Sequence, residues 1–399
     1  MIHEYELFQQ AIPVLERLKQ AGYEAYFVGG SVRDALLGKP IADVDIATSA
    51  TPLEVKAIFH STIDIGIEHG TVLVLEQGNG YEITTFRTEA EYEDFRHPSS
   101  VTFVRSLEED LKRRDFTINA LAIGLEDTLV DFFCGVEDLQ QGIIRCVGEP
   151  LERFNEDALR MVRAVRFVSQ LNFELDTKTK QAIYELRKNL KQVAVERIRV
   201  EWLKLLTGPA RQQGIQFFVE TKLYESCPLL EDKERELQQF ANNTAVQLTA
   251  IQAWILWLYY MNVSEQEVSK WLKAWKCSNQ EIEQTKQGLT ALRERLTKKW
   301  DFDMAYRCLE EVALQIEPLL ISIGGTTQIE SMQEIYQQLP IRTVADIALN
   351  GNDIKQLLQL EKNGAVIGQA LQSMKEAILA GTLKNNPKEL KQFLLENFS

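Results

Sequence analysis

The chain has 399 residues, of which 45% are hydrophobic and 26% charged, a composition typical of soluble globular proteins with several domains. The most apolar run, Ala253–Met261, is too short to span a bilayer, and the five cysteines lack disulfide or zinc-ligand spacing. The net charge of −14 argues against a uniform nucleic-acid-binding surface, although residues 151–212 carry thirteen basic and eight acidic side chains. We therefore expect a reduced, cytoplasmic protein with one local basic region.

The first 150 residues mix the periodicities of strands and helices. We expect a strand over Ala25–Gly29, followed by a helix over SVRDALLG that ends at Gly38. The polar stretch Arg87–Arg105 is predicted to be an exposed, mobile loop. Further strands of this small α/β sheet domain are predicted at Val44–Ala47, Thr71–Leu75, Tyr81–Phe86, Ile118–Gly124 and Leu129–Phe133, with a hairpin turn at Gly78-Asn79-Gly80.

Strand patterns fade after Phe154. Asn155 is expected to cap a helix that runs to Ser169, with Glu156 and Asp157 in its first turn, where the helix dipole favours acids. Helical periodicity and capping signals recur from there to the end of the chain. The predicted fold class is therefore an α/β domain followed by an all-α remainder.

The segment Asp43-Val44-Asp45 alternates acidic, apolar and acidic residues. In a strand, both carboxylates would point to one face and Val44 would enter the core. Two adjacent carboxylates repel each other unless a cation lies between them, and their hard oxygen atoms suit Mg²⁺. This pattern alone is weak evidence for a metal site, because solvated strand edges also show it. The neighbouring residues decide between the two interpretations.

Two glycines lie shortly upstream of this acid pair. Gly29 and Gly30 precede the predicted helix, where glycine lets the backbone approach a phosphate and free N–H groups point outward. Arg33 on that helix could bind phosphate through both arms of its guanidinium, although an ion pair with Asp34 is the simpler role. A phosphate cradle beside a carboxylate pair predicts a site for a nucleoside triphosphate and one or two Mg²⁺ ions.

Such a site joins a 3′-hydroxyl to a nucleoside monophosphate and releases pyrophosphate. We expect Asp43 and Asp45 to be the catalytic, metal-binding residues. A third acid on an adjacent strand often completes sites of this kind. Glu82 is the candidate, and its simpler role is that of a solvent-facing strand residue.

The segment RRDFTIN follows the predicted loop and leads into a strand. Arg114 in this segment is expected to bind phosphate, and Asp115 and Asn119 are candidates for hydrogen bonds to ribose hydroxyls. A basic surface turn is the simpler alternative for the whole segment.

Basic residues recur every three positions along the helix predicted from Asn155, at Arg160, Arg163 and Arg166. This stripe, with few acids beside it, fits a nucleotide or phosphate surface better than a salt-bridged solvent face. Asp157 and Arg160 together offer one acceptor beside one donor, which matches the edges of cytosine and adenine but not those of guanine and uracil. A fixed pair of this kind is therefore expected to select C and A.

Four ordered segments, GGSVRDALLG, DVDIAT, RRDFTINALA and EDALRMVRAVRF, resemble the motifs of bacterial class II CCA-adding enzymes, the tRNA nucleotidyltransferases of the polymerase-β-like superfamily. The resemblance is dense over Tyr23–Phe167 and diffuse beyond it. It implies template-independent addition of C, C and A to the 3′ end of tRNA from CTP and ATP, for tRNA maturation and repair. It also implies Mg²⁺ binding by Asp43 and Asp45 and nucleotide contacts at Gly30, Arg33, Arg114, Asp157, Arg160, Arg163 and Arg166.

The same resemblance implies four parts of the chain. These are a nucleotidyltransferase head (1–150), a helical neck that recognises bases (151–212), a helical body (213–323) and a helical tail that binds the tRNA elbow (324–399). No His-Asp phosphohydrolase pattern occurs in the second half, which favours the compact type of enzyme. A homodimer is an expectation from the family alone.

Several related activities remain alternatives. Poly(A) polymerases and enzymes that add only CC or only A share the head motifs, although the complete stretch Arg87–Arg105 favours the full CCA adder. A non-catalytic tRNA-binding protein would not need intact Asp43, Asp45 and Arg114. An enzyme that modifies small acceptors such as antibiotics would need neither the long helical half nor the arginine stripe.

Overall fold

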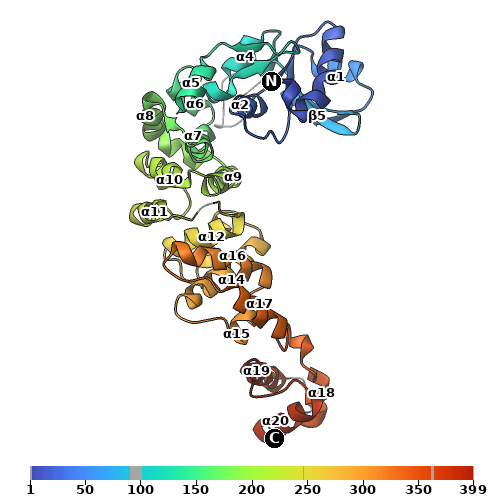
Figure 1. Ribbon diagram of the computed structural model, residues 1–399, viewed down its shortest axis with the longest axis vertical. Coiled ribbons are helices and arrows are strands. Elements are labelled where there is room, and N and C mark those ends of the chain that lie inside the picture. Colours follow the sequence, from blue (N-terminus) through green and yellow to red (C-terminus); the bar gives the residue numbers. More distant parts are fainter. Residues whose placement is uncertain (1, 90–100, 246, 361–363, 399) are drawn as a thin grey trace. The chain divides into compact units, whose positions relative to one another are not determined.

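The computed structural model describes residues 2–89, 101–245, 247–360 and 364–398. The chain folds as two compact units, Met1–Ala241 and Asn242–Ser399. Within the described residues, every strand belongs to the first unit and the second unit contains helices alone (Figure 1). The predicted order of an α/β domain followed by an all-helical remainder is confirmed. No helix in the described ranges has the length and apolar character needed to cross a lipid bilayer.

A seven-stranded sheet forms the centre of the first unit, in the order β3-β4-β5-β2-β1-β8-β9. Of its neighbouring pairs, only β2 and β5 run parallel. The buried Phe27 ring of β1 packs against Phe8 of α1 (Glu6–Gln20), with ring centroids 4.7 Å apart, so α1 covers part of the sheet. The strands are β1 (Ala25–Val28), β2 (Asp45–Thr48), β3 (Thr62–Gly66), β4 (Thr71–Glu76), β5 (Asn79–Thr85), β8 (Leu121–Ile123) and β9 (Leu129–Asp131).

The predicted hairpin between β4 and β5 is present, but its turn is displaced. It turns at Gln77-Gly78, because Asn79 and Gly80 already pair with β4. Both turn residues have positive φ, 50° for Gln77 and 84° for Gly78, as a two-residue type I′ turn requires. The prediction of a turn at Gly78-Asn79-Gly80 is therefore wrong, although the hairpin itself is confirmed.

The predicted loop Arg87–Arg105 is in part a second, two-stranded sheet. Strands β6 (Arg87–Glu89) and β7 (Val101–Phe103) pair antiparallel, so the loop prediction is wrong for these residues. Residues 90–100 of the predicted loop lie outside the described residues. Gly70 has a φ of 86°, and a Cβ there would lie 2.8 Å from the Phe103 ring. Glycine at this position therefore lets β7 pack closely against the turn that precedes β4.

The single helix predicted to start at Asn155 is two helices. α6 (Pro150–Glu156) ends at Asp157, whose backbone is extended, and α7 (Leu159–Leu171) begins two residues later. Asn155 lies in the last turn of α6, so the predicted N-cap is wrong. The Asp157 carboxylate instead accepts a hydrogen bond from the N–H of Leu159, at 3.0 Å. Asp157 thus occupies a break between helices rather than a first helical turn.

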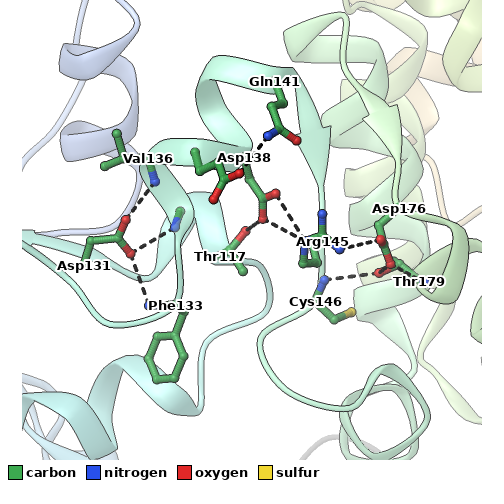
Figure 2. A network of polar contacts seen from close by, with 12 residues as sticks. Thr117, Asp131, Phe133, Val136, Asp138, Gln141, Arg145, Cys146, Asp176 and Thr179 are labelled. Atoms are coloured by element: carbon green, nitrogen blue, oxygen red, sulfur yellow. Dashed lines mark hydrogen bonds and ion pairs between the residues drawn. The ribbon is translucent and has the colours of Figure 1, made fainter.

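A polar network holds the 3₁₀ turn Thr117–Asn119 in place (Figure 2). The buried Asp138 accepts hydrogen bonds from the Thr117 hydroxyl at 2.6 Å and from Arg145 at 3.1 Å. Arg145 also donates to Asp176, at 2.6 Å. These bonds connect the turn, which carries residues of the site described below, to the helices that follow the sheet.

The first unit extends beyond residue 212, where the neck was predicted to end. Helix α10 (Arg211–Glu220) packs closely against α7 because it carries Gly214. A Cβ at this position would lie 2.7 Å from the Cβ of Ser169 on α7. The division at residues 150, 212 and 323 is therefore not the division into two units, and it stays a proposal. The other helices of the first unit are α2 (Gly30–Leu36), α3 (Pro52–Ile58), α4 (Leu107–Lys112), α5 (Gly135–Gln141), α8 (Thr177–Leu186), α9 (Val195–Leu206), α10 (Arg211–Glu220) and α11 (Glu234–Ala241).

Helices of the second unit pack around two sets of buried apolar side chains. The ring centroids of Trp257 and Trp275, both fully buried, lie 5.2 Å apart. A separate cluster nearer the C-terminus includes Ile354, Met374 and Leu390. The helices are α12 (Ala250–Tyr260), α13 (Val268–Ala274), α14 (Asn279–Arg295), α15 (Phe302–Arg307), α16 (Glu310–Ser322), α17 (Ile329–Gln338), α18 (Gly351–Leu357), α19 (Ala365–Leu379) and α20 (Pro387–Phe398).

Candidate nucleotide site

One cavity of about 700 Å³ in the first unit brings together most of the residues singled out in the sequence. The nine residues that the family resemblance assigns to metal or nucleotide binding line it, as do the further candidates Gly29, Asp115 and Asn119, whereas Glu82 does not. The lining is rich in positive charge, although the chain as a whole is acidic. Such a cavity favours a polyanionic ligand. Its charged residues are Arg33, Arg87, Arg113, Arg114, Arg160, Arg163, Arg166 and Arg197, together with Asp43, Asp45, Asp115 and Asp157.

The two predicted metal ligands, Asp43 and Asp45, both line the cavity, and Val44 between them is buried. Strand β2 begins at Asp45, one residue later than the predicted strand Val44–Ala47, so Asp43 and Val44 lie in the preceding loop and the two carboxylates do not share one strand. Burial and the nearby Asp43 raise the pKa of Asp45, while Arg114 opposes this shift. Repulsion between two neighbouring carboxylates is relieved by a bound cation.

The donor set fits a hard divalent cation that shares its coordination with a substrate. The described residues contain no group of three His, Cys, Asp or Glu side chains arranged to hold a metal ion. Asp43 and Asp45 supply carboxylate oxygens only, and the arginines around them can hold phosphates nearby. Phosphate oxygens and water would complete the coordination, which is how Mg²⁺ is usually bound in nucleotide sites.

Glu82 lies directly across from Asp45, because β5 runs parallel to β2 in this register. Directly opposed residues project from the same face of a sheet. The charge of Glu82 contributes to the raised pKa of Asp45, after burial and Asp43. The Glu82 side chain is exposed, and its role as a third acid stays a prediction.

The predicted phosphate cradle, Gly29-Gly30, lies beside the carboxylates. β1 ends at Val28, whose partner in β2 is Asp45. Gly29 has a φ of 75°, and a Cβ there would lie 3.1 Å from the Arg114 guanidinium and 3.8 Å from the Asp45 carboxylate. Glycine is therefore favoured at position 29 by both backbone conformation and space.

A chain of hydrogen bonds runs from α2 to α7. Arg33 donates to Asp34 at 2.8 and 2.9 Å and to Asn119 at 2.7 Å, so the simpler role expected for Arg33 is present. Asp115 accepts from Asn119 at 3.0 Å and from Arg163 at 2.6 and 2.8 Å. Burial alone would raise the pKa of Asp115, but Arg163 and Asn119 lower it to about 2.

The two residues predicted to recognise the base have different partners. Arg160 donates to Glu156 at 2.7 Å and to the carbonyl oxygen of Arg113 at 3.0 Å. Asp157 accepts from Arg197 of α9, at 2.8 Å. Arg197 also lines the cavity and was not among the predicted site residues. Its place in the basic region 151–212 was the only signal in the sequence that pointed to it.

The arginines of the site have acidic partners, some from nearby positions and some from distant parts of the chain. Arg166 pairs with Glu201 at 2.9 Å, and the same carboxylate group lies 3.7 Å from Arg163. The buried Asp110 contacts Arg114 at 3.3 Å. Few acids were expected beside Arg160, Arg163 and Arg166 of α7. That expectation is wrong, because the fold brings acidic side chains next to them. Any phosphate must share these guanidinium groups with carboxylates.

Three segments of the chain match models of known protein families. Residues 25–145 match the Poly A polymerase head domain. Residues 172–233 match the family described as the probable RNA and SrmB-binding site of polymerase A. Residues 247–394 match the putative domain 2 of tRNA nucleotidyltransferases.

Relatives match almost the whole chain. It is 47% identical over 387 residues to the CCA-adding enzyme of Enterococcus faecalis, which covers 97% of this chain and 95% of that protein. It is 46% identical over 395 residues to the CCA-adding enzyme of Bacillus cereus, covering 98% and 99% of the two proteins. The crystal structure of the Bacillus stearothermophilus CCA-adding enzyme in complex with CTP matches with a TM-score of 0.90 at 40% identity, over 98% of this chain and 97% of that one.

Proposed function

The chain belongs to the CCA-adding enzymes, and we propose that its cavity joins two C residues and then one A residue to the 3′ end of tRNA. The substrates are CTP, ATP and a tRNA that lacks its terminal nucleotides. The observation that carries the proposal is the meeting of a carboxylate pair, a glycine turn and an arginine-rich helix in one cavity. Such addition serves tRNA maturation and repair.

In each cycle, the terminal 3′-hydroxyl of the tRNA loses its proton to water, and its oxygen forms a bond to the α-phosphorus of the nucleotide. The bond from that phosphorus to the bridging oxygen breaks, and pyrophosphate leaves. Asp43 and Asp45 are the proposed ligands of a divalent cation, which we take to be Mg²⁺. A cation bound there would lower the pKa of the 3′-hydroxyl and offset charge on the leaving pyrophosphate.

The other lining residues divide into those that hold the sugar and phosphates and those that recognise the base. Gly30 and Arg33 lie at the glycine turn, Arg114 lies beside it, and Arg163 and Arg166 line the same cavity. We assign these residues to the triphosphate and ribose because each offers N–H donors.

Base selection is assigned to Asp157 and Arg160, at the other end of the α7 segment. The Asp157 carboxylate would accept a hydrogen bond from the amino group of cytosine or adenine. The Arg160 guanidinium would donate to the adjacent ring nitrogen. Guanine and uracil present a carbonyl and an N–H in these positions, so they would place acceptor against acceptor and donor against donor.

The remainder of the chain is proposed to hold the tRNA. The head (1–150) and neck (151–212) contain the cavity, and the body (213–323) and tail (324–399) are assigned to the tRNA itself. Because tRNA and its end-processing are cytoplasmic in bacteria, we assign the protein to the cytoplasm. A homodimer stays a prediction, which the mass of the purified protein in solution would test.

The test is addition of radiolabelled nucleotides to a tRNA stripped of its 3′ end, with each nucleotide supplied alone and in combination. CTP alone should extend the tRNA by two residues, and CTP with ATP by three, after which extension should stop. A long A tail would instead identify a poly(A) polymerase. Extension that ends after two C residues, or that requires a preformed CC end, would identify a partial enzyme.

A further inference from the structure

Three guanidinium groups surround one aromatic ring in the cavity wall. The Cζ atom of Arg166 lies 3.8 Å from the centroid of the Phe167 ring, that of Arg33 5.1 Å and that of Arg163 5.6 Å. Phe167 is only 3% exposed, yet it lines the cavity. A cation within about 6 Å of a ring centroid is attracted by the ring quadrupole. One side chain therefore attracts three of the arginines assigned to the nucleotide.

The Phe167 ring lies where two elements meet. Arg33 comes from α2, which follows the glycine turn, whereas Arg163 and Arg166 come from α7. The Phe116 ring packs edge-on against Phe167, with centroids 5.6 Å apart and an interplanar angle of 81°. Because Phe167 is fixed on this side, it can hold α2 and α7 at a constant separation.

Three like charges in so small a space repel one another. Burial, helped by the nearby Arg163 and Arg33 and opposed by Glu201, lowers the pKa of Arg166 to about 10. Asp34, Asp115 and Glu201 pair with these arginines and offset part of the repulsion, but they share N–H donors that a phosphate needs. An aromatic ring adds attraction for the face of a guanidinium and occupies no further donor in the guanidinium plane.

We propose that Phe167 is a positioning residue that holds Arg33, Arg163 and Arg166 as one cluster for the phosphates of the incoming nucleotide. This inference rests on the proposed binding of CTP and ATP in the cavity. Arg160, assigned to the base, precedes Arg166 by six residues, or about 9 Å along an α-helix. Loss of the ring should therefore weaken contacts to the phosphates and leave contacts to the base unchanged.

The test compares CTP with CMP, which shares the base and ribose but lacks two phosphates. Titration calorimetry of the full chain would give the affinity of each ligand. Phe167→Leu keeps an apolar side chain and removes the ring, and it should weaken CTP binding by about tenfold and CMP binding by less than about twofold. Phe167→Tyr keeps the ring and should bind CTP within about threefold of the unchanged protein.

Phe218→Leu is the matched control, since Phe218 is fully buried against Trp202 at a ring centroid distance of 4.8 Å and does not line the cavity. It should leave both affinities unchanged. Equal weakening of CTP and CMP by Phe167→Leu, or no weakening of either, would overturn the positioning role. If Phe167→Leu does not unfold cooperatively, Phe167→Met decides, because it also removes the ring and keeps an apolar side chain of similar length. An unchanged ratio of CTP to CMP affinity in that variant contradicts the inference.

Different results would contradict the proposed function and the proposed role of Phe167. If the unchanged protein adds neither C nor A to tRNA, the proposed function fails. If it adds both, and Phe167→Leu binds CTP as tightly as the unchanged protein, only the role of Phe167 fails.

Discussion

The carboxylate of Asp157 accepts a hydrogen bond from the guanidinium of Arg197, at 2.8 Å, although forty positions separate the two residues. Asp157 occupies the break between α6 and α7, and Arg197 belongs to α9. Both residues line the cavity. The orientation of the acceptor assigned to the base is therefore set by α9 together with the first residue of α7, Leu159, whose N–H also donates to this carboxylate.

Arg197→Ala should reduce the discrimination of the enzyme against G and U. Loss of a charge-assisted hydrogen bond of about 1.5–3 kcal/mol would leave the Asp157 carboxylate less firmly oriented, although the Leu159 N–H still donates to it, and kcat/KM for CTP should fall by about tenfold or more. Steady-state kinetics with each of the four nucleotides would measure both effects. Lys204→Ala, an exposed change on the same helix, is the control. Unchanged selectivity in Arg197→Ala would show that Asp157 needs no such support.

Exchange of the two proposed base-reading residues, Asp157→Arg with Arg160→Asp, should shift preference from C and A towards U and G. Each base contact of this kind discriminates by about 1–3 kcal/mol, so the relative kcat/KM should change by at least about tenfold. Arg160 also binds Glu156, and total activity is therefore expected to fall. The informative quantity is the ratio between nucleotides, and a ratio that stays constant contradicts the edge-matching account.

Asp115 should make the first unit more stable at neutral than at acidic pH. Its pKa in the folded chain is about 2, below the ordinary value of 3.8, so its contribution is present above about pH 4 and is lost as the pH falls towards 2. The shift corresponds to about 2 kcal/mol. Asp115→Asn should lower the free energy of unfolding by about this amount at pH 7 and by progressively less below pH 4.

Urea denaturation at a series of pH values would measure this difference for Asp115→Asn. Asp232→Asn, a change of an exposed residue in the same unit, should show no such pH dependence. A loss of stability in Asp115→Asn that is as large at pH 3 as at pH 7 would contradict an ionic origin.

Glu82→Gln should lower kcat without changing the affinity for CTP if Glu82 acts as a third acid. Glu82 opposes Asp45 in the sheet, and loss of one carboxylate near a cation site would reduce kcat by about tenfold to a hundredfold. Metal titrations of activity should show a weaker apparent affinity for Mg²⁺. Kinetics equal to those of the unchanged enzyme would identify Glu82 as an ordinary strand residue.

The parts of the site that depend on neighbouring residues were predictable from the sequence. The glycine turn and the Asp43–Asp45 pair can each be recognised from residues that are only a few positions apart in the sequence. Their proximity in space followed once β1 and β2 were recognised as strands, since Val28 and Asp45 are partners in the sheet.

Features that depend on distant pairing were not predictable in this way. Strand β6 consists of Arg87, Thr88 and Glu89, which is too short and polar to show alternation, and its partner strand lies beyond residue 100. The helix break at Asp157 is stabilised by Arg197, and Arg166 is paired with Glu201. These contacts arise from tertiary packing, and the spacing of the residues along the chain does not predict them.

The central claim is that Asp43 and Asp45 carry the chemistry while other residues bind the nucleotide. The most direct test measures both properties in Asp45→Asn, by single-turnover addition of C to a tRNA stripped of its 3′ end and by equilibrium binding of CTP. The rate constant should fall by about a thousandfold or more, with CTP affinity within about threefold of that of the unchanged enzyme. Addition of C by Asp45→Asn at a rate within about tenfold of the unchanged enzyme would contradict the claim.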